Sequence, residues 1–471
     1  MRTRPIVLSV FLAAGVLVSV VAADAGSERT NVRGMGMART YVAGSRGLDA
    51  VGINPANLAA PDSGTVTMSL IPFGVHAGTD MMTYGTYKEY FTGVAAGTER
   101  VGRYLTDADK QKILEGFPDG VGRVAADAQF RPIGLSINVG SFGRFAFTIT
   151  EQVAFDADIP HDYAEFILYG NAPGSVFDFS ATRGRAQWTR EYALSFGRAV
   201  PVPGFLQSLV KNLNAGVAVK YVQGFAYYEM SNSATSLATG TDGILHARVG
   251  VLARGASIDL IHDNGDNSFT PFPDAAGSGM AFDLGVSGMV TDYLTVGIAV
   301  TDIGSIGWTK HLEQVRVDTA FTIDDPGLES QRTAIENAMK GTRVDGEAFS
   351  TNLPTKLRIG VAVEVTAIPV VKEFMVGQMD LAADYNQGLY DVPGSTTRGR
   401  FSLGMEYRIV KFFPLRFGVS FGGEDRSNLA LGFGLHFGFL DMDFGSENLN
   451  FLFAEDNFSK ASLAMGLKLR F

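Results

Sequence analysis

The 471-residue sequence contains no cysteine. This absence excludes disulfide bonds, thiol nucleophiles and cysteine-based metal sites together. Histidine is also scarce: only 6 are present, none of them in an H-x-x-x-H pair. No G-x-S-x-G or P-loop motif occurs either. These absences predict a protein that is not an enzyme and that uses no cofactor or metal.

Long apolar runs are missing as well, since none after Val21 approaches the ~18 residues of a membrane-spanning helix. The net charge of -10 argues against a nucleic-acid partner. The chain is nevertheless 46% hydrophobic and only 19% charged, which excludes a disordered protein. Its 56 glycines and 34 phenylalanines suit strands with aromatic side chains on one face and small ones on the other.

The amino-terminus has the pattern of an export signal. Arg2 and Arg4 precede an apolar run at 6–21, and small residues follow at 22–25. This order predicts a secretory signal peptide over residues 1–25, cleaved after Ala23 or Ala25. The alternative is an uncleaved amino-terminal anchor.

The last stretch, 461–471, reads ASLAMGLKLRF and places an apolar residue at every second position. Its eleven residues match the ~9–11 that a tilted transmembrane strand needs. Lipid tolerates no open sheet edge, so one such strand implies a closed barrel. The terminal phenylalanine resembles the insertion signal of bacterial outer-membrane proteins, which makes Leu467, Leu469 and Phe471 the candidate insertion residues.

Similar alternation recurs along the chain. Assigning short links to the periplasm and long ones to the exterior gives strands that run consistently up and down. We therefore predict an all-β protein, with a transmembrane antiparallel barrel of about 14 strands over 63–471. The expected strands are 65–76, 124–139, 144–155, 187–198, 213–228, 281–289, 293–303, 356–365, 375–386, 401–409, 415–422, 429–438, 439–444 and 461–471. Helices are expected at 106–117 and 330–340, and strand extensions at 245–261.

Residues 28–60 do not alternate. They contain RGMGMART at 33–40 and the triplet Asn54-Pro55-Ala56, and such dense glycine indicates a compact, turning path. Together with 216–224 and 282–308, this segment resembles FadL-type outer-membrane transporters, whose relatives include the PorV-like barrel component of type IX secretion. The resemblance implies an amino-terminal hatch at 26–62 that plugs the barrel, with the triplet at its gate. An ordinary surface turn is the alternative for the triplet.

Charges of both signs fall at inward positions of neighbouring predicted strands. Such charges would pair across strands or hold a plug by charge-assisted hydrogen bonds, unless they are merely solvated. The positions are Lys356, Arg358, Asp380, Asp384, Glu406, Arg408 and Arg416. Separately, Pro132 interrupts a predicted strand two residues before Gly134, which predicts a kink in the barrel wall.

The FadL-type resemblance implies uptake of hydrophobic small molecules, with hatch movement and lateral release through the kinked wall. A scaffold for surface secretion or assembly and a general porin are the alternatives. The expected location is the outer membrane of a Gram-negative-type bacterium. Expected partners are its lipid and lipopolysaccharide, the barrel-assembly machinery during insertion, and a hydrophobic ligand. An oxygen-rich stretch at 263–267 lacks the later glutamate of a calcium loop and is interpreted as a polar turn.

Overall fold

The computed structural model describes residues 28–61, 64–97, 99–257, 273–325, 328–423, 426–454 and 456–471. The expected signal peptide and the polar turn at 263–267 lie outside these ranges. In the described part of the chain, no helix has the length and apolar character needed to cross a membrane.

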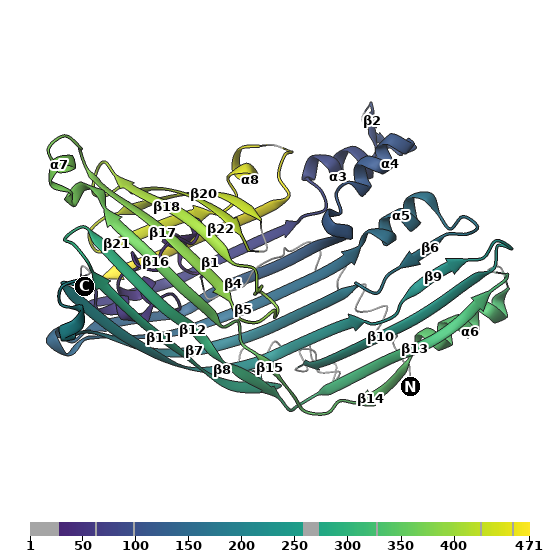
Figure 1. Ribbon diagram of the computed structural model, residues 1–471, viewed down its shortest axis with the longest axis horizontal. Coiled ribbons are helices and arrows are strands. Elements are labelled where there is room, and N and C mark those ends of the chain that lie inside the picture. Colours follow the sequence, from purple (N-terminus) through teal and green to yellow (C-terminus); the bar gives the residue numbers. More distant parts are fainter. Residues whose placement is uncertain are drawn as a thin grey trace.

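Fourteen antiparallel strands form a closed barrel (Figure 1). Each strand pairs with its neighbours around the wall, and the last one pairs with the first, so the ring has no open edge. The expected all-β barrel of 14 strands is thus confirmed. In order around the ring the strands are β1 (Val66–Thr79), β4 (Val121–Asn138), β5 (Arg144–Pro160), β7 (Arg183–Val200), β8 (Asn212–Asn232), β11 (Gly277–Met289), β12 (Leu294–Trp308), β16 (Lys356–Glu364), β17 (Gln378–Gly388), β18 (Arg400–Arg408), β19 (Leu415–Gly422), β20 (Ser427–His436), β21 (Leu440–Ser446) and β22 (Lys460–Arg470).

The outer face of the barrel is apolar because the strands alternate. Leu194, Leu284 and Ile298 are 57%, 53% and 54% exposed, while their neighbours Ser195 and Ala299 are buried inside. Large exposed side chains recur in this way on strand after strand. A continuous apolar exterior of this kind is unfavourable in water and typical of a barrel surface that lies in lipid.

The two ends of the barrel differ in their links. Short links such as 139–143, 290–293 and 437–439 lie at one end, called here the short-turn end. Links at the long-loop end, on the right of Figure 1, include 80–120, 233–276 and 309–355. The strands β5, β7 and β8 continue past the ring at that end, where β8 also pairs with β10 (Leu245–Ser257).

This extension contains strands that the sequence pattern did not predict. β13 (Leu312–Ile323) falls in a stretch expected to be a loop, but it pairs along its whole length with β10. The shorter strands of the extension are β6 (Val176–Asp178), β9 (Ser236–Thr239), β14 (Thr342–Asp345) and β15 (Phe349–Asn352), while β2 (Val94–Ala96) and β3 (Glu99–Val101) form a separate two-stranded sheet. The two expected helices are present as α4 (Asp107–Leu114), with a Thr106 capping box, and α6 (Glu329–Met339). The other helices are α2 (Val32–Met35), α3 (Tyr84–Phe91), α5 (His161–Tyr169), α7 (Pro369–Lys372), α8 (Leu449–Phe453) and the 3-10 turns η1 (Gly47–Ala50), η2 (Pro55–Ala59), η3 (Pro118–Gly120), η4 (Gly140–Phe142), η5 (Gly204–Leu206) and η6 (Val365–Ala367).

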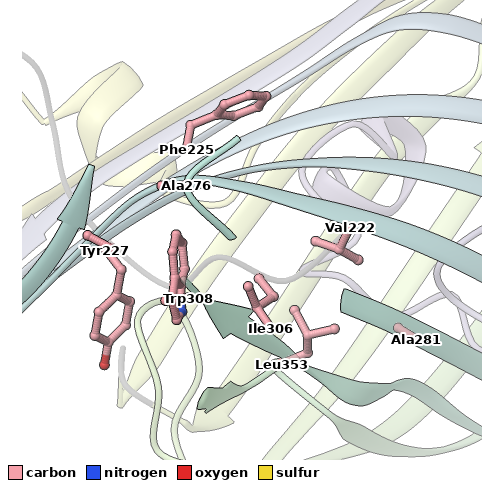
Figure 2. Close-up of a cluster of buried hydrophobic side chains, with 9 residues drawn as sticks. Val222, Phe225, Tyr227, Ala276, Ala281, Ile306, Trp308 and Leu353 are labelled. Carbon is pink, nitrogen blue, oxygen red and sulfur yellow. The ribbon is translucent and has the colours of Figure 1, made fainter. Parts of the chain in front are cut away.

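A cluster of buried apolar side chains joins the barrel wall to this extension (Figure 2). Trp308 is fully buried at the end of β12, and its indole nitrogen donates to Thr351 at 2.9 Å. Val222, Phe225, Ile306 and Leu353 belong to the same cluster. These contacts hold β8 and β12 against β15 at the long-loop end of the barrel.

Residues 28–60, called here the inner segment, lie inside the barrel. Between 28 and 58 only Arg33, Gly44 and Arg46 are not buried. Hydrogen bonds and close contacts link the segment to β4, β11, β17, β18 and other strands around the ring. It therefore fills the lumen toward the short-turn end.

Candidate functional site

The first half of the inner segment is bound to the wall by buried ion pairs. Asn31 caps α2 by accepting from the Gly34 amide, and Arg33 then points to Glu406 on β18. The guanidinium binds this carboxylate with two bonds, of 2.6 and 2.5 Å. Arg416 on β19 donates to the same carboxylate at 2.6 Å and contacts Asp443 at 2.8 Å. Such bidentate, charge-assisted bonds fix geometry as well as adding energy.

Glu447, just after β21, is the centre of a second group. Arg29 and Arg39 of the inner segment both bind its carboxylate, the latter at 2.5 Å, and Arg400 of β18 reaches it at 3.3 Å. Arg29 also donates to Asp127 of β4 at 2.7 Å. All these carboxylate and guanidinium groups are almost fully buried. Removing one partner would therefore leave charge buried without compensation.

Two further carboxylates complete this attachment. Asp384 of β17 accepts from the backbone amides of Tyr41 and Val42 at 2.5 and 2.9 Å. Glu28 pairs with Arg358 of β16 and lies 3.7 Å from Lys356. The first half of the segment is thus bonded to strands on several sides of the ring.

The surrounding cations control the ionisation of the two glutamates outside the strands. Burial alone would raise the pKa of Glu28, but Arg358, Lys356 and Arg39 lower it well below the usual range. For Glu447, burial is likewise outweighed by Arg39, Arg29 and Arg400, and its pKa is lowered. Both groups are therefore ionised at neutral pH.

The second half of the segment is attached mainly by uncharged contacts, although Asp49 of η1 pairs with Lys468 of β22 at 2.6 Å. Asn54 caps η2 by accepting from the Ala56 amide at 3.2 Å, and its side-chain amide donates to the Val286 carbonyl of β11 at 3.3 Å. Pro55 rests against glycines of the wall. A Cβ added at Gly216 of β8 would lie 2.2 Å from the Pro55 carbonyl carbon, and one at Gly197 of β7 would lie 2.5 Å from its oxygen. Only glycine allows the backbone to come this close.

A gap interrupts the ladder between β1 and β4. Pairing runs from Val66 to Ser69 and resumes at Phe73, so three residues on each strand face each other without pairing. The unpaired residues include Ile71, in the left-handed region at φ 50°, and the two prolines Pro72 and Pro132. Proline cannot donate to a ladder, so both strands lack amide hydrogens where the wall is broken.

The gap has an apolar rim and an apolar backing. Leu70, Ile71 and Ile133 are 37%, 58% and 46% exposed around it. Behind the wall, Leu48 of η1 lies 3.3 Å from where a Cβ on Gly134 would be. Leu48 belongs to a buried apolar cluster with Ala50, Val51, Leu58 and Ala146. Apolar side chains therefore lie on both the exterior and the lumen side of the gap, where the buried side chains of Arg131 and Ser69 also come close to Gly134.

The positions named from the sequence fall into four places. Asn54, Pro55 and Ala56 form the start of η2 inside the lumen, and Pro132 and Gly134 border the gap. The insertion candidates lie on the strand that closes the ring: Leu467 and Leu469 pair with β1, and the carbonyl of Phe471 accepts from the amides of Thr65 and Val66 at 2.6 and 3.0 Å. The inward charges at Arg358, Asp384, Glu406 and Arg416 contact the inner segment or its ion pairs, whereas Asp380 pairs with Arg408 at 2.6 Å.

Sequence reasoning missed the buried group around Glu447. The sequence did contain a hint of this group: Arg29, Arg33 and Arg39 lie in a segment expected to be buried. Buried arginines require carboxylate partners. Their partners could not be identified without the fold, since Glu447 is 418 residues from Arg29.

Two cavities in the described structure are small and have mixed polar and apolar linings. One, of about 30 Å³, is lined by Glu28, Arg39, Lys356 and Arg400 among others. The other, of about 20 Å³, lies against β5, β7, β8 and β12. Each has room for little more than one water molecule.

One group of side chains in the described residues has metal-ligand types at close range. His161, Asp162 and Glu165 of α5 place their ligand atoms within 4.8 Å of one another. The His161 Nδ1 atom lies 3.5 and 3.7 Å from the two carboxylates, which is ordinary surface ion pairing.

Several solved structures are similar to this chain. The toluene transporter TbuX of Ralstonia pickettii is 12% identical with a TM-score of 0.46, over 95% of this chain and 98% of that one. The Pseudomonas putida toluene transporter TodX is 11% identical with a TM-score of 0.46, over 96% and 100%. A Pseudomonas aeruginosa FadL homologue is 14% identical with a TM-score of 0.46, over 96% and 100%. Two of these three are toluene transporters, and the third is a homologue of FadL.

A search of curated protein sequences finds no significant match. A family model does match, over residues 55–446, which include part of the inner segment and thirteen complete strands of the ring. That model describes a family of unknown function, DUF5723, and this chain belongs to it.

Proposed function

We propose that this protein is an outer-membrane channel for hydrophobic small molecules, in which the inner segment acts as a hatch. The observation that carries the proposal is the gap between β1 and β4, with apolar side chains on its rim and an apolar cluster behind it. The apolar outer face supports the location, and the short-turn end would then face the periplasm.

The gap supports lateral passage, from the lumen into the bilayer, rather than a water-filled route. An apolar solute gains ~25 cal/mol per Å² on leaving water, so Leu70, Ile71 and Ile133 offer it a favourable path. Leu48 stands directly behind this path. Movement of η2, together with η1 that packs against it through Leu48 and Leu58, would therefore open it.

The two cavities found in the structure are too small to hold a ligand in the absence of movement, so transport would need the inner segment to shift. Sites that enclose small ligands usually measure ~300–1,000 Å³. The two cavities, of about 30 and 20 Å³, are far smaller. Neither cavity could hold a ligand of that size unless the inner segment shifted, and the filled lumen argues against a general porin.

A disulfide lock tests this gate, because the natural chain has no cysteine. Leu48→Cys and Gly134→Cys together would tie η1 to the wall of the gap. The readout is uptake of the apolar dye N-phenyl-1-naphthylamine by vesicles that contain the purified protein. We expect uptake to fall to the level of empty vesicles after oxidation and to return after reduction, with each single cysteine variant as control.

Normal uptake by the fully oxidised double variant would contradict the proposal. A second variant pair addresses the other end of the segment. Asn54→Ala or Pro55→Ala should leave barrel assembly intact and change uptake, because each weakens the seat of η2. Unchanged uptake at normal surface levels would count against a gate at η2.

The filled lumen favours a second candidate, a scaffold for surface secretion or assembly. Such a protein needs no passage, and the sheet of β6, β9, β10 and β13 beyond the ring offers surface for partners. Recovery of a defined complex with other envelope proteins, together with no dye uptake by the natural chain, would favour this candidate over the channel.

A further inference from the structure

A second group of buried charges lies in the lumen, away from the ion pairs of the inner segment. Lys220 of β8 is fully buried, and its ammonium contacts three carboxylates. It lies 2.6 Å from Asp302 of β12, 3.0 Å from Asp283 of β11 and 3.4 Å from Glu191 of β7. One positive charge thus faces three negative ones.

Two other cations lie close to this group: one is bound elsewhere, and the other is shared between Glu191 and the inner segment. Arg190 binds Glu151 on β5, and Arg131 interacts with Asp49 as well as with Glu191 and donates to Thr150 at 3.4 Å. Three carboxylates thus share Lys220 and part of the charge of Arg131, so negative charge exceeds positive charge in this group. Burying an ionised carboxylate without compensation costs several kcal/mol.

One carboxylate oxygen of this group has no partner. The Oδ1 atom of Asp302 accepts from Lys220, but its Oδ2 atom makes no hydrogen bond although the residue is only 4% exposed. A buried acceptor left in this state requires an explanation, such as a water molecule or an ion.

The backbone holds Asp302 in an unusual conformation. Its φ of 58° lies in the left-handed region, and an irregularity in the register between β11 and β12 falls at this residue. The Asp302 amide donates to Asp283 at 2.7 Å, and its carbonyl accepts from Thr355 at 2.7 Å. Bulges of this kind re-aim a side chain, here toward the lumen.

The side chain is aimed at the cavity of about 20 Å³. Asp302 and Glu191 line it together with the oxygen-bearing side chains of Gln152, Gln187 and Thr189. Val222 and Leu353 of the apolar cluster in Figure 2 close another side. The cavity therefore offers carboxylate, amide and hydroxyl oxygens, and it has room for about one water molecule or one ion.

We propose that this cavity binds one hard divalent cation of the calcium class. Calcium takes 6–8 oxygen ligands, from carboxylates, amide oxygens and water, which is the set present here. A charge of two would make the three carboxylates and Lys220 neutral as a group. The ion would tie β5, β7 and β12 together above the inner segment, and the proposal holds whether the barrel transports or scaffolds.

Calorimetric titration of the full chain in detergent, stripped with a chelator, tests the proposal with Ca²⁺ alone as ligand. We expect one Ca²⁺ per chain, and at least tenfold weaker binding in Glu191→Gln and Asp302→Asn. Glu229→Gln is the matched control, because this β8 carboxylate pairs with Arg254 and does not line the cavity. It should bind as the natural chain does.

Thermal unfolding with and without Ca²⁺ gives a second readout, since a ligand that binds only the folded state raises the melting temperature. The rise should be present in the natural chain and in Glu229→Gln and reduced in Glu191→Gln. If Asp302→Asn does not fold, Thr189→Val removes one oxygen at little cost in shape and should also weaken binding. Absence of Ca²⁺ binding, or equal binding by Glu191→Gln, would overturn the proposal and leave the cavity to water.

Discussion

The two halves of the inner segment are attached to the same barrel by different physical means. Residues 28–42 are held by buried charges that converge on Glu406, Glu447 and Asp384. Residues 54–59 are held by the Asn54 side chain and by close contact with glycines. Separating a buried, hydrogen-bonded ion pair costs much free energy, whereas van der Waals contacts are individually weak and are lost in a small displacement. The comparison indicates that the first half is an anchor and the second half is the part that moves.

The largest expected effect comes from the anchor. Glu447→Gln would leave Arg29, Arg39 and Arg400 facing a neutral side chain. Loss of one partner from a buried ion pair costs about 3–5 kcal/mol, so the anchor should open. Limited proteolysis should then cut within 28–42 at least a hundredfold faster than in the natural chain. Equal protection of both proteins would show that these pairs do not hold the segment.

A smaller effect is expected at the mobile half. Gly216→Val would place side-chain atoms where Pro55 lies, and overpacking of this kind costs about 1–3 kcal/mol. Hydrogen exchange should rise in 54–60 and stay unchanged in 28–42. Gly102→Ala is the control, because a Cβ there meets nothing within 4 Å. A uniform rise along the whole segment would contradict a division into two halves.

Mild acid should produce the smallest change, and only in the anchor. The folded pKa values of Glu28 and Glu447 are lowered, so their contribution is complete above the unfolded pKa of ~4.3 and is lost as pH falls toward the folded values. Between pH 7 and pH 5 the protection of residues 28–39 should stay constant, and it should begin to fall near pH 4. A loss of protection that starts between pH 7 and pH 5 would show that Glu28 and Glu447 are not the groups responsible.

The barrel could be predicted from the sequence because lipid imposes one rule on every strand. Alternation such as that of 293–303 or 461–471 needs no knowledge of the partner strand, and all fourteen expected strands are present. β13 was missed because no membrane enforces its pattern, and its partner β10 is determined only by the fold.

The site was accessible to the sequence only in part. Inward positions such as Glu406 and Arg416 follow from alternation, so their location in the lumen could be derived. Their partners could not be derived, because Arg33 lies in a segment whose sequence shows no strand or helix periodicity. Only one side of the gap could be predicted from the sequence, because Pro132 indicates a break in β4. The facing break at Ile71 and Pro72 can be recognised only when the pairing of β1 with β4 is known.

The central claim, that residues 54–60 move while 28–42 remain bound, is tested most directly by hydrogen exchange of the natural chain in lipid nanodiscs. The amides of Asn57 and Ala60, bonded within η2, should exchange at least tenfold faster than those of Tyr41 and Val42, which are bonded to Asp384. Equal rates for the two groups, or exchange only together with the barrel strands, would contradict the claim.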